Sequence, residues 1–204
     1  MQNKTEEKKS SGSTVLADDG FYFGIGAFET IAVEEGIPQL LERLRDSLAF
    51  FGIDQSVEEK EVLAYLNACP QSEEKQHGAL KITVTAQNKL FGLRKNTYSE
   101  EQYQKGFRLG FSEIRRNETS PLTYHKTLGI ADNIMEKRNA KKSGLDEKIF
   151  LNQKGQISEG TVSNIFFVRS GKLYTPDLSC GLLPGILREY LCETENVEEA
   201  VIYP

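Results

Sequence analysis

Apolar side chains recur along the chain at spacings that predict a mixture of helices and strands. From about Pro38 they repeat with the period of a helix, and the polar residues between them fall on the opposite face. That helix would end at Gly52, and a second helix is expected over residues 56–68. Residues 80–85 alternate strictly between apolar and polar, which predicts a strand with one buried face. The apolar positions of the first helix are Leu40, Leu41, Leu44, Leu48 and Phe51.

The N-terminal part opens with a polar stretch and then changes character. Residues 1–13 are charged and rich in Ser and Gly, which predicts disorder and does not resemble a signal peptide. From Phe21 to Val33, aromatic and β-branched residues around two glycines predict a strand entered through a tight turn. Glu35 and Gly36 then predict a hairpin turn, and residues 107–111 alternate like a further strand.

A polar segment that ends in proline, Glu113 to Pro121, predicts a linker between two halves of the molecule. A helix is expected after it, from about Leu128 to Lys142. Later elements are expected as a strand at 148–151, a hairpin of 164–169 with 172–174, and a helix within 181–192. The expected fold class is α+β, with a disordered tail at 1–17, a small α+β domain at 18–114, an interdomain linker at 115–121 and a larger domain at 122–204.

Composition and charge narrow the function classes. The 204 residues include 25 basic and 30 acidic side chains, and this balance predicts neither nucleic acid nor a membrane as a partner. The three cysteines, Cys69, Cys180 and Cys192, form no CxxC pair, so neither a disulfide framework nor a zinc site is expected. With His77 and His125 as the two histidines, a histidine-based metal centre is not expected either, and the cytosol is the expected compartment.

Three segments carry candidate chemistry, and their order, spacing and content resemble the class IV aminotransferases. These are enzymes of fold type IV that use pyridoxal 5′-phosphate (PLP). The resemblance runs from about Asp18 to Ile202, and it implies a two-domain architecture like that of D-amino-acid aminotransferases and a homodimer with sites near the subunit interface. The segments are GIGAFET (24–30) with ERLRDS (42–47), HKTLGIADNIMEKRNAKKSGLDEKIFLN (125–152), and ISEGTVSNIFFVRSGKLYTP (157–176) with LLPGILRE (182–189).

The resemblance implies that Lys126 carries PLP as an imine. A lysine in this role must be partly desolvated, because a lowered pKa leaves the free amine that attacks an aldehyde. The same amine would then move the substrate proton. Glu159 matches the family's carboxylate that keeps the pyridine nitrogen protonated, and Arg43 matches the family's phosphate arginine.

A second phosphate contact is implied by the segment PGILR. The backbone N–H groups of Gly185, Ile186 and Leu187 match the family's phosphate-binding turn, which opens a helix. The family usually has threonine where this chain has Leu187, so a hydroxyl contact is lost there. Arg188 suits a salt bridge inside the fold as well as a ligand role, and Asn164 is expected to be a hydrogen-bonded scaffold residue.

Departures from the motifs of the two aminotransferase subgroups indicate which subgroup of the family the chain resembles most. Ala131 stands where branched-chain aminotransferases have a tyrosine that contacts the cofactor, and Phe28 stands where D-amino-acid aminotransferases have a tyrosine for the substrate carboxylate. The segment TVTAQ (83–87) lacks the arginine that often binds substrate. The chain most resembles aminodeoxychorismate lyases, which convert 4-amino-4-deoxychorismate to p-aminobenzoate and pyruvate. Phe28 and Thr83 are the candidate substrate contacts.

Alternatives stay open because the usual family members continue beyond the point where this sequence stops. The C-terminal domain is therefore expected to be short and the phosphate site less complete. The alternatives are an aminotransferase acting on branched-chain or D-amino acids, a degenerate member that serves as a binding protein, and an α+β domain whose motifs are coincidental. The presence of Lys126, Glu159 and Arg43 together argues against the degenerate member, since the three answer different demands of PLP chemistry.

Overall fold

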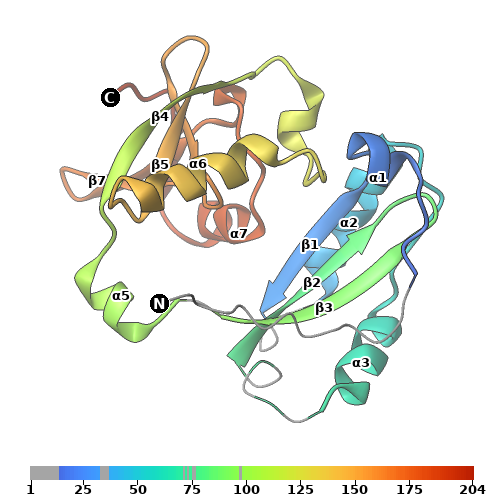
Figure 1. Ribbon diagram of the computed structural model, residues 1–204. Coiled ribbons are helices and arrows are strands. Elements are labelled where there is room, and N and C mark those ends of the chain that lie inside the picture. The colour runs from blue at the N-terminus through green and yellow to red at the C-terminus, as the bar shows by residue number, and fades with distance from the viewer. Residues whose placement is uncertain (1–13, 33–36, 71, 73, 75–76, 97) are drawn as a thin grey trace.

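The structure is a computed structural model that describes residues 14–32, 37–70, 72, 74, 77–96 and 98–204. Figure 1 shows the elements in two groups, with the chain passing from one to the other through the short helix α5 (Glu100–Lys105). The first group contains one three-stranded sheet and its helices, and the second contains two three-stranded sheets with theirs. The expected α+β fold class is confirmed.

The first group is an antiparallel sheet in the order β1-β2-β3 with helices packed on one face. Its elements are α1 (Asp19–Phe23), β1 (Ala27–Ala32), α2 (Ile37–Phe50), α3 (Glu59–Ala68), β2 (Gly78–Val84) and β3 (Lys89–Lys95). The helix expected from about Pro38 and the strand expected at 80–85 are both present. The strand β3 was missed, because it lies at the edge of the sheet and its sequence, KLFGLRK, does not alternate cleanly between apolar and polar residues.

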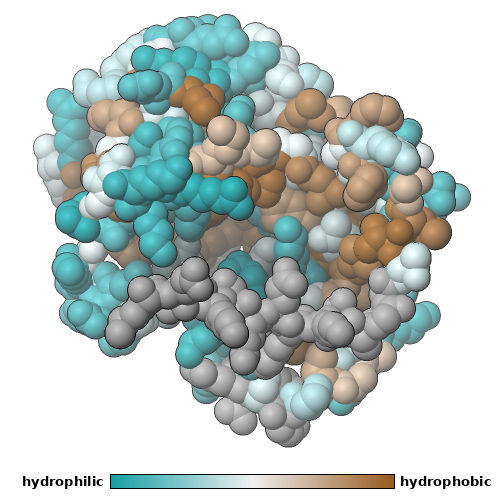
Figure 2. All heavy atoms as spheres, viewed as in Figure 1, coloured by the Kyte–Doolittle hydropathy of each residue, from teal (hydrophilic) through white to brown (hydrophobic). Residues whose placement is uncertain are grey.

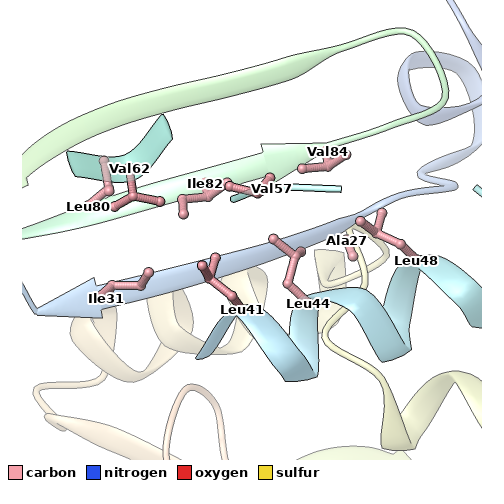
Figure 3. Close-up of a cluster of buried hydrophobic side chains, with 10 residues drawn as sticks. All are labelled: Ala27, Ile31, Leu41, Leu44, Leu48, Val57, Val62, Leu80, Ile82 and Val84. Carbon is pink, nitrogen blue, oxygen red and sulfur yellow. The ribbon is translucent and has the colours of Figure 1, made fainter. Parts of the chain in front are cut away.

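Figure 3 shows the core of this group, where the apolar stripe of α2 meets the inward face of the sheet. Leu41, Leu44 and Leu48 are buried against the strands, as their helical spacing predicts. The alternation of β2 likewise buries Leu80, Ile82 and Val84. Alternate residues of a strand point to opposite faces, so the residues between them lie on the other, open face of the sheet.

The segment expected to begin as a strand at Phe21 is helical at first. The side chain of Asp18 accepts hydrogen bonds from the backbone N–H groups of Gly20 (3.0 Å) and Phe21 (3.2 Å) and so caps α1. Gly24, with a φ of 72°, ends this helix, and the strand begins only at Ala27. Local capping therefore overrides the strand propensity of the aromatic run. The expected hairpin turn at residues 35–36 lies outside the described residues.

Aromatic side chains of α1 stand in solvent. Phe21, Tyr22 and Phe23 are 64–74% exposed, and Figure 2 shows hydrophobic surface gathered on the side of the molecule where α1 lies. Just before α1, the backbone of Leu16 exchanges two hydrogen bonds with the side chain of Asn88 (2.7 and 2.9 Å). Leu16 was expected within the disordered tail at 1–17, and these bonds connect it to the β2–β3 turn.

The second group contains the sheets β4-β5-β6 and β7-β8-β9. Its strands are β4 (Leu109–Arg116), β5 (Glu147–Asn152), β6 (Ile157–Gly160), β7 (Phe167–Arg169), β8 (Lys172–Pro176) and β9 (Val197–Ala200). Its helices are η1 (Pro121–Tyr124), α6 (Ala131–Lys142), η2 (Leu178–Cys180) and α7 (Ile186–Thr194). The expected hairpin of 164–169 with 172–174 is present as β7 and β8, which pair antiparallel.

The expected linker differs from the structure at its start. Strand β4 runs on to Arg116 and pairs in parallel with β5, so residues 113–116 are strand rather than connection. These residues are polar because they alternate in a strand at the edge of a sheet. In the sequence, a polar edge strand resembles a linker. The chain leaves the sheet after Arg116 and reaches η1 before α6. The division of the chain into two domains at residues 115–121 stays a prediction.

A buried carboxylate ties α6 to the sheet beneath it. Glu136 accepts hydrogen bonds from Ser112 (2.7 Å), Asn139 (2.8 Å) and Lys148 (3.0 Å). The bonds from Asn139 and Ser112, followed by that from Lys148, lower the pKa of Glu136 to about 2. The bonds from β4 and β5 therefore fix the helix that follows the candidate PLP lysine.

The cysteines, the length of the helices and the grouping of possible metal ligands bear on the function classes considered from the sequence. Cys180 is buried, whereas Cys69 and Cys192 are partly exposed. Across the described part of the chain, no helix has the length and apolar character needed to cross a membrane. Within the same residues, no group of three or more His, Cys, Asp or Glu side chains is arranged to hold a metal ion.

Candidate active site

Lys126 is held between the first sheet and helix α2. Its carbonyl accepts a hydrogen bond from the backbone N–H of Phe28 (3.0 Å), and its own N–H donates to the hydroxyl of Ser47 (3.3 Å). The next residue, Thr127, forms a β-bridge with Ala27. The main chain at Lys126 is thus fixed from two sides, which is what a residue that must present its side chain precisely requires.

The amine of Lys126 lies in partly desolvated surroundings. Its Nζ is 5.0 Å from the centre of the Phe28 ring, and the residue is half-buried. Burial lowers the pKa of the Lys126 amine from its ordinary value, with Arg43 adding to the effect, while Glu29 and Glu159 oppose it. A lowered pKa increases the fraction of neutral amine, which is the nucleophilic form. The geometry therefore suits the role predicted for Lys126.

Glu159 lies in β6 and is buried at the side of the site. One carboxylate oxygen accepts a hydrogen bond from Arg116 Nη2 (2.6 Å), and the other accepts one from the backbone N–H of Leu183 (3.1 Å). Burial raises the pKa of the Glu159 carboxyl, and the Arg116 guanidinium opposes that rise. Each carboxylate oxygen can accept two hydrogen bonds, so capacity for a further donor remains.

Arg43 reaches from α2 across to the second group of elements. Its Nε and Nη2 donate to the two carboxylate oxygens of Glu29 (2.7 and 2.8 Å), and its Nη1 donates to the carbonyl of Pro184 (3.2 Å). Pro184 directly precedes Gly185, so the guanidinium is tethered at the start of α7. Sequence reasoning missed the pairing with Glu29, which is a fully buried acid at an inward position of an alternating strand.

The start of α7 offers backbone N–H groups of the kind that bind phosphate. Gly185 is the N-cap residue and no side chain caps the helix there, so Ile186 and Leu187 stand in a first turn whose N–H groups are available. The side chain of Leu187 is 69% exposed and takes no part in this turn. The amide of Asn164 donates to the carbonyl of Leu183 (3.0 Å) and supports the loop, as a scaffold residue would.

Arg188 follows this turn but belongs to the interior of the fold. Its guanidinium donates to the carbonyl of Pro176 (2.9 Å) and pairs with the carboxylate of Glu199. These contacts join α7 to β8 and β9. Of the two roles considered for Arg188, the structure shows the internal salt bridge.

The open face of the first sheet lies next to the Lys126 amine, because the Phe28 ring that the amine approaches is on this face. Phe28 pairs with Thr83 and Thr30 pairs with Lys81 across β1 and β2, so these four side chains share one face. The Nζ of Lys81 lies 4.6 Å from the centre of the Phe28 ring that Lys126 also approaches. Partial desolvation lowers the pKa of Lys81, although the residue as a whole is exposed, and the charge of Arg94 adds to this. The exposure of Lys81 is what an alternating strand predicts, but its position beside the Phe28 ring depends on the pairing of β1 with β2 and was therefore missed.

Arg116 is the second cation that sequence reasoning missed. Besides pairing with Glu159, its guanidinium carbon lies 4.4 Å from the centre of the Phe150 ring. Its Nε is buried and has no hydrogen-bond partner among the described residues. The local sequence EIRRNETSP gave no signal for this role, which depends on β4 lying beside β5.

These residues fit PLP group by group. A partly desolvated amine at Lys126 suits its aldehyde, a buried carboxylate at Glu159 suits its ring nitrogen, and the Arg43 guanidinium beside the start of α7 suits its phosphate. Ile186 and Leu187 would contribute backbone N–H groups. Phe28 and Thr83 lie on the open face of the first sheet, where a substrate would approach.

Comparison with known proteins identifies the family. The sequence model of the family "Amino-transferase class IV" matches residues 26–204, so the chain belongs to the class IV aminotransferases. This family depends on PLP, and it includes aminodeoxychorismate lyases as well as aminotransferases. The predicted family and cofactor are thereby confirmed.

Individual relatives come from several branches of the family. The chain is 30% identical over 197 residues to an aminodeoxychorismate lyase of Bacillus subtilis, with 86% of this chain and 66% of that protein covered. It is 27% identical over 215 residues to a D-alanine aminotransferase of Bacillus licheniformis, with 96% and 76% covered. The branched-chain aminotransferase of Thermoproteus uzoniensis shares the fold, with a TM-score of 0.74, 23% identity, and 91% and 71% covered. The chain thus spans about two thirds of the length of the lyase.

Proposed function

We propose that the chain is a PLP-dependent lyase that converts 4-amino-4-deoxychorismate to p-aminobenzoate and pyruvate. The observation that carries the proposal is that two amines, those of Lys126 and Lys81, both lie near the Phe28 ring. One amine would act on the reacting carbon while the other would bind a substrate carboxylate. The flat apolar ring beside both amines suits a flat six-membered carbocycle.

The chemistry asks little more of the protein than these groups supply. PLP, when bound, withdraws electrons from the carbon that bears the substrate amine. Lys126 would take the proton from that carbon, the carbon–oxygen bond to the pyruvate unit would break, and the ring would become aromatic. The leaving oxygen needs a hydrogen-bond donor. Thr30, on the same face of the sheet as Phe28, is the residue we assign to that task.

The substrate's carboxylates need cations, and the open face of the first sheet supplies one. Lys81 projects from this face, and we assign it to a carboxylate of the substrate. Phe28 and Thr83 would contact the ring. Aminotransferases of the family use a tyrosine and an arginine to bind substrate carboxylates. In this chain Phe28 stands in place of the tyrosine, and the segment 83–87 contains no arginine, so we assign the task to Lys81.

An aminotransferase acting on branched-chain or D-amino acids is the competing function, because relatives of both kinds match the chain. Two assays separate the functions. The chain with PLP is incubated with aminodeoxychorismate and p-aminobenzoate is measured. It is incubated separately with branched-chain or D-amino acids plus 2-oxoglutarate, and glutamate is measured. We expect p-aminobenzoate, and none from Lys126→Ala. Glutamate without p-aminobenzoate would contradict the lyase.

A further inference from the structure

Glu29 is an acid in a place where an apolar residue would be expected. It lies on the same face of β1 as the core residues Ala27 and Ile31, and its side chain is 0% exposed. A buried charge costs free energy unless it is paired and hydrogen-bonded, and replacing a buried pair by apolar residues is often neutral or stabilising. Stability therefore does not explain the acid at this position.

What Glu29 holds is the guanidinium of Arg43, and it does so in the fork-to-fork manner. Both carboxylate oxygens are used, with distances of 2.7 Å to Nε and 2.8 Å to Nη2. The carbonyl of Pro184 takes one N–H of Nη1 (3.2 Å). A guanidinium carries five N–H donors, so two are left, one on Nη1 and one on Nη2. Their direction is set by the three bonds already made.

The two remaining donors lie next to the start of α7. Pro184 immediately precedes the N-cap residue Gly185, so Nη1 is within hydrogen-bond distance of the chain just before the first helical turn. That turn offers N–H groups and the positive end of the helix dipole. A phosphate there would receive donors from the helix on one side and from Arg43 on the other.

We propose that Glu29 is a positioning residue for the phosphate of PLP, acting through Arg43. This rests on the proposed function, since it assumes that PLP binds with its phosphate at the start of α7. Glu29 contacts neither cofactor nor substrate. It fixes the plane of the guanidinium so that the two free N–H groups face the phosphate. The negative charge of Glu29 also weakens the attraction between Arg43 and the phosphate. The gain in phosphate affinity from positioning the guanidinium is larger than this loss.

Glu29→Gln tests the proposal, because the amide keeps the shape of the side chain but turns a donor toward a donor of Arg43. Affinity is measured for PLP and for pyridoxal, which lacks the phosphate, by titration of the absorbance band of the bound aldehyde. Loss of one charge-assisted hydrogen bond corresponds to about tenfold or more in a binding constant. We expect the preference for PLP over pyridoxal to fall by that factor. A general loss of structure would weaken both ligands alike.

Glu136→Gln is the matched control, since it removes a buried carboxylate with a cation partner away from the phosphate site. It should leave the preference for PLP unchanged. In an Arg43→Met background, Glu29→Gln should have no further effect on that preference. If Glu29→Gln does not fold, Glu29→Asp keeps the charge but shortens the reach and should weaken PLP in the same direction.

Other results would overturn the proposal. An unchanged preference in Glu29→Gln would show that the acid does not position Arg43 for phosphate. Tighter PLP binding would show that its negative charge acts only against the phosphate. In both cases the wild-type chain still binds PLP and the proposed function stands. A wild-type chain that binds neither PLP nor pyridoxal would overturn the proposed function and this inference together.

Discussion

Two buried glutamates in the second group of elements make ion pairs, but their surroundings shift the carboxyl pKa in opposite directions. Glu136, on α6, accepts hydrogen bonds from Ser112, Asn139 and Lys148, and these lower its pKa to about 2. Glu159, on β6, accepts one bond on each oxygen, and burial raises its pKa despite the Arg116 guanidinium.

The difference distinguishes an anchor from a candidate functional group. Glu136 accepts three hydrogen bonds from three parts of the chain, so its ionised form is strongly favoured and its effect is to hold α6 on the sheet. Glu159 is less fully used and its charge is less favoured, which leaves it able to accept a donor from a ligand. Removing the first should affect folding, and removing the second should affect function.

The largest effect is expected from Lys126→Ala, which removes the amine beside the less saturated carboxylate. The rate of the proposed reaction should fall by about 1,000-fold or more, because both the nucleophile and the proton-transfer group are lost. Stability should be unchanged or higher, since a partly desolvated amine is removed. The measurement is p-aminobenzoate formation together with urea unfolding. A variant that keeps most of its activity would contradict the assignment.

The two glutamates are compared directly by Glu159→Gln and Glu136→Gln. Glu159→Gln should lower the rate by about 100-fold, within the range that positioned groups contribute. Its change in stability should be smaller than that of Glu136→Gln, because burial raises the pKa of Glu159 and so disfavours its charge. Glu136→Gln should keep its rate but lose about 3 kcal/mol of unfolding free energy, because the charge of Lys148 is left buried without its partner. Rates and urea midpoints are measured on both variants. Equal effects of the two substitutions on rate would remove the distinction.

The pH dependence of stability sharpens the same contrast. The folded-state pKa of Glu136 lies below its unfolded value, so its contribution is present above the unfolded value and is lost as pH falls through about 2. The stability gap between the wild-type chain and Glu136→Gln should therefore be wider at about pH 6 than at about pH 3. Urea unfolding at both values checks this. A gap independent of pH would mean that the Glu136 charge does not anchor α6.

The smallest effect is expected at the start of α7. Leu187 is exposed and stands where the family usually has threonine, so Leu187→Thr adds a hydroxyl beside the proposed phosphate site at little structural cost. PLP affinity should rise by a few-fold, corresponding to about 1 kcal/mol for one hydrogen bond. Titration with PLP measures it, with pyridoxal as the control. An equal gain for pyridoxal would place the effect away from the phosphate.

The elements that the sequence predicts well are those whose burial pattern is periodic. The stripe of α2 and the alternation of β2 both pack into one core, as Leu44 and Ile82 illustrate. Helix α1 was misassigned, although Asp18 before it and Gly24 after it carry the capping signals. Here the aromatic run outweighed those signals in the prediction.

The residues of the candidate site divide in the same way. Lys126, Glu159 and Arg43 could be predicted because family motifs surround them. Glu29, Lys81 and Arg116 could not, because each gains its position from a partner distant in sequence. Arg116 on β4 meets Glu159 on β6, two strands away in the same sheet, and Lys81 meets Phe28 across a strand pair. Such pairings follow from tertiary structure, which the pattern along a single strand does not reveal.

The account depends most on which amine reacts with PLP, and reductive trapping measures that directly. The wild-type chain is mixed with PLP, reduced with borohydride, digested, and the modified lysine is located by mass spectrometry. Lys81 provides an internal comparison, because it lies near the same phenyl ring and burial lowers its pKa as well. We predict the pyridoxyl group on Lys126. Its presence on Lys81 in place of Lys126, or the absence of any modified lysine, would contradict the account.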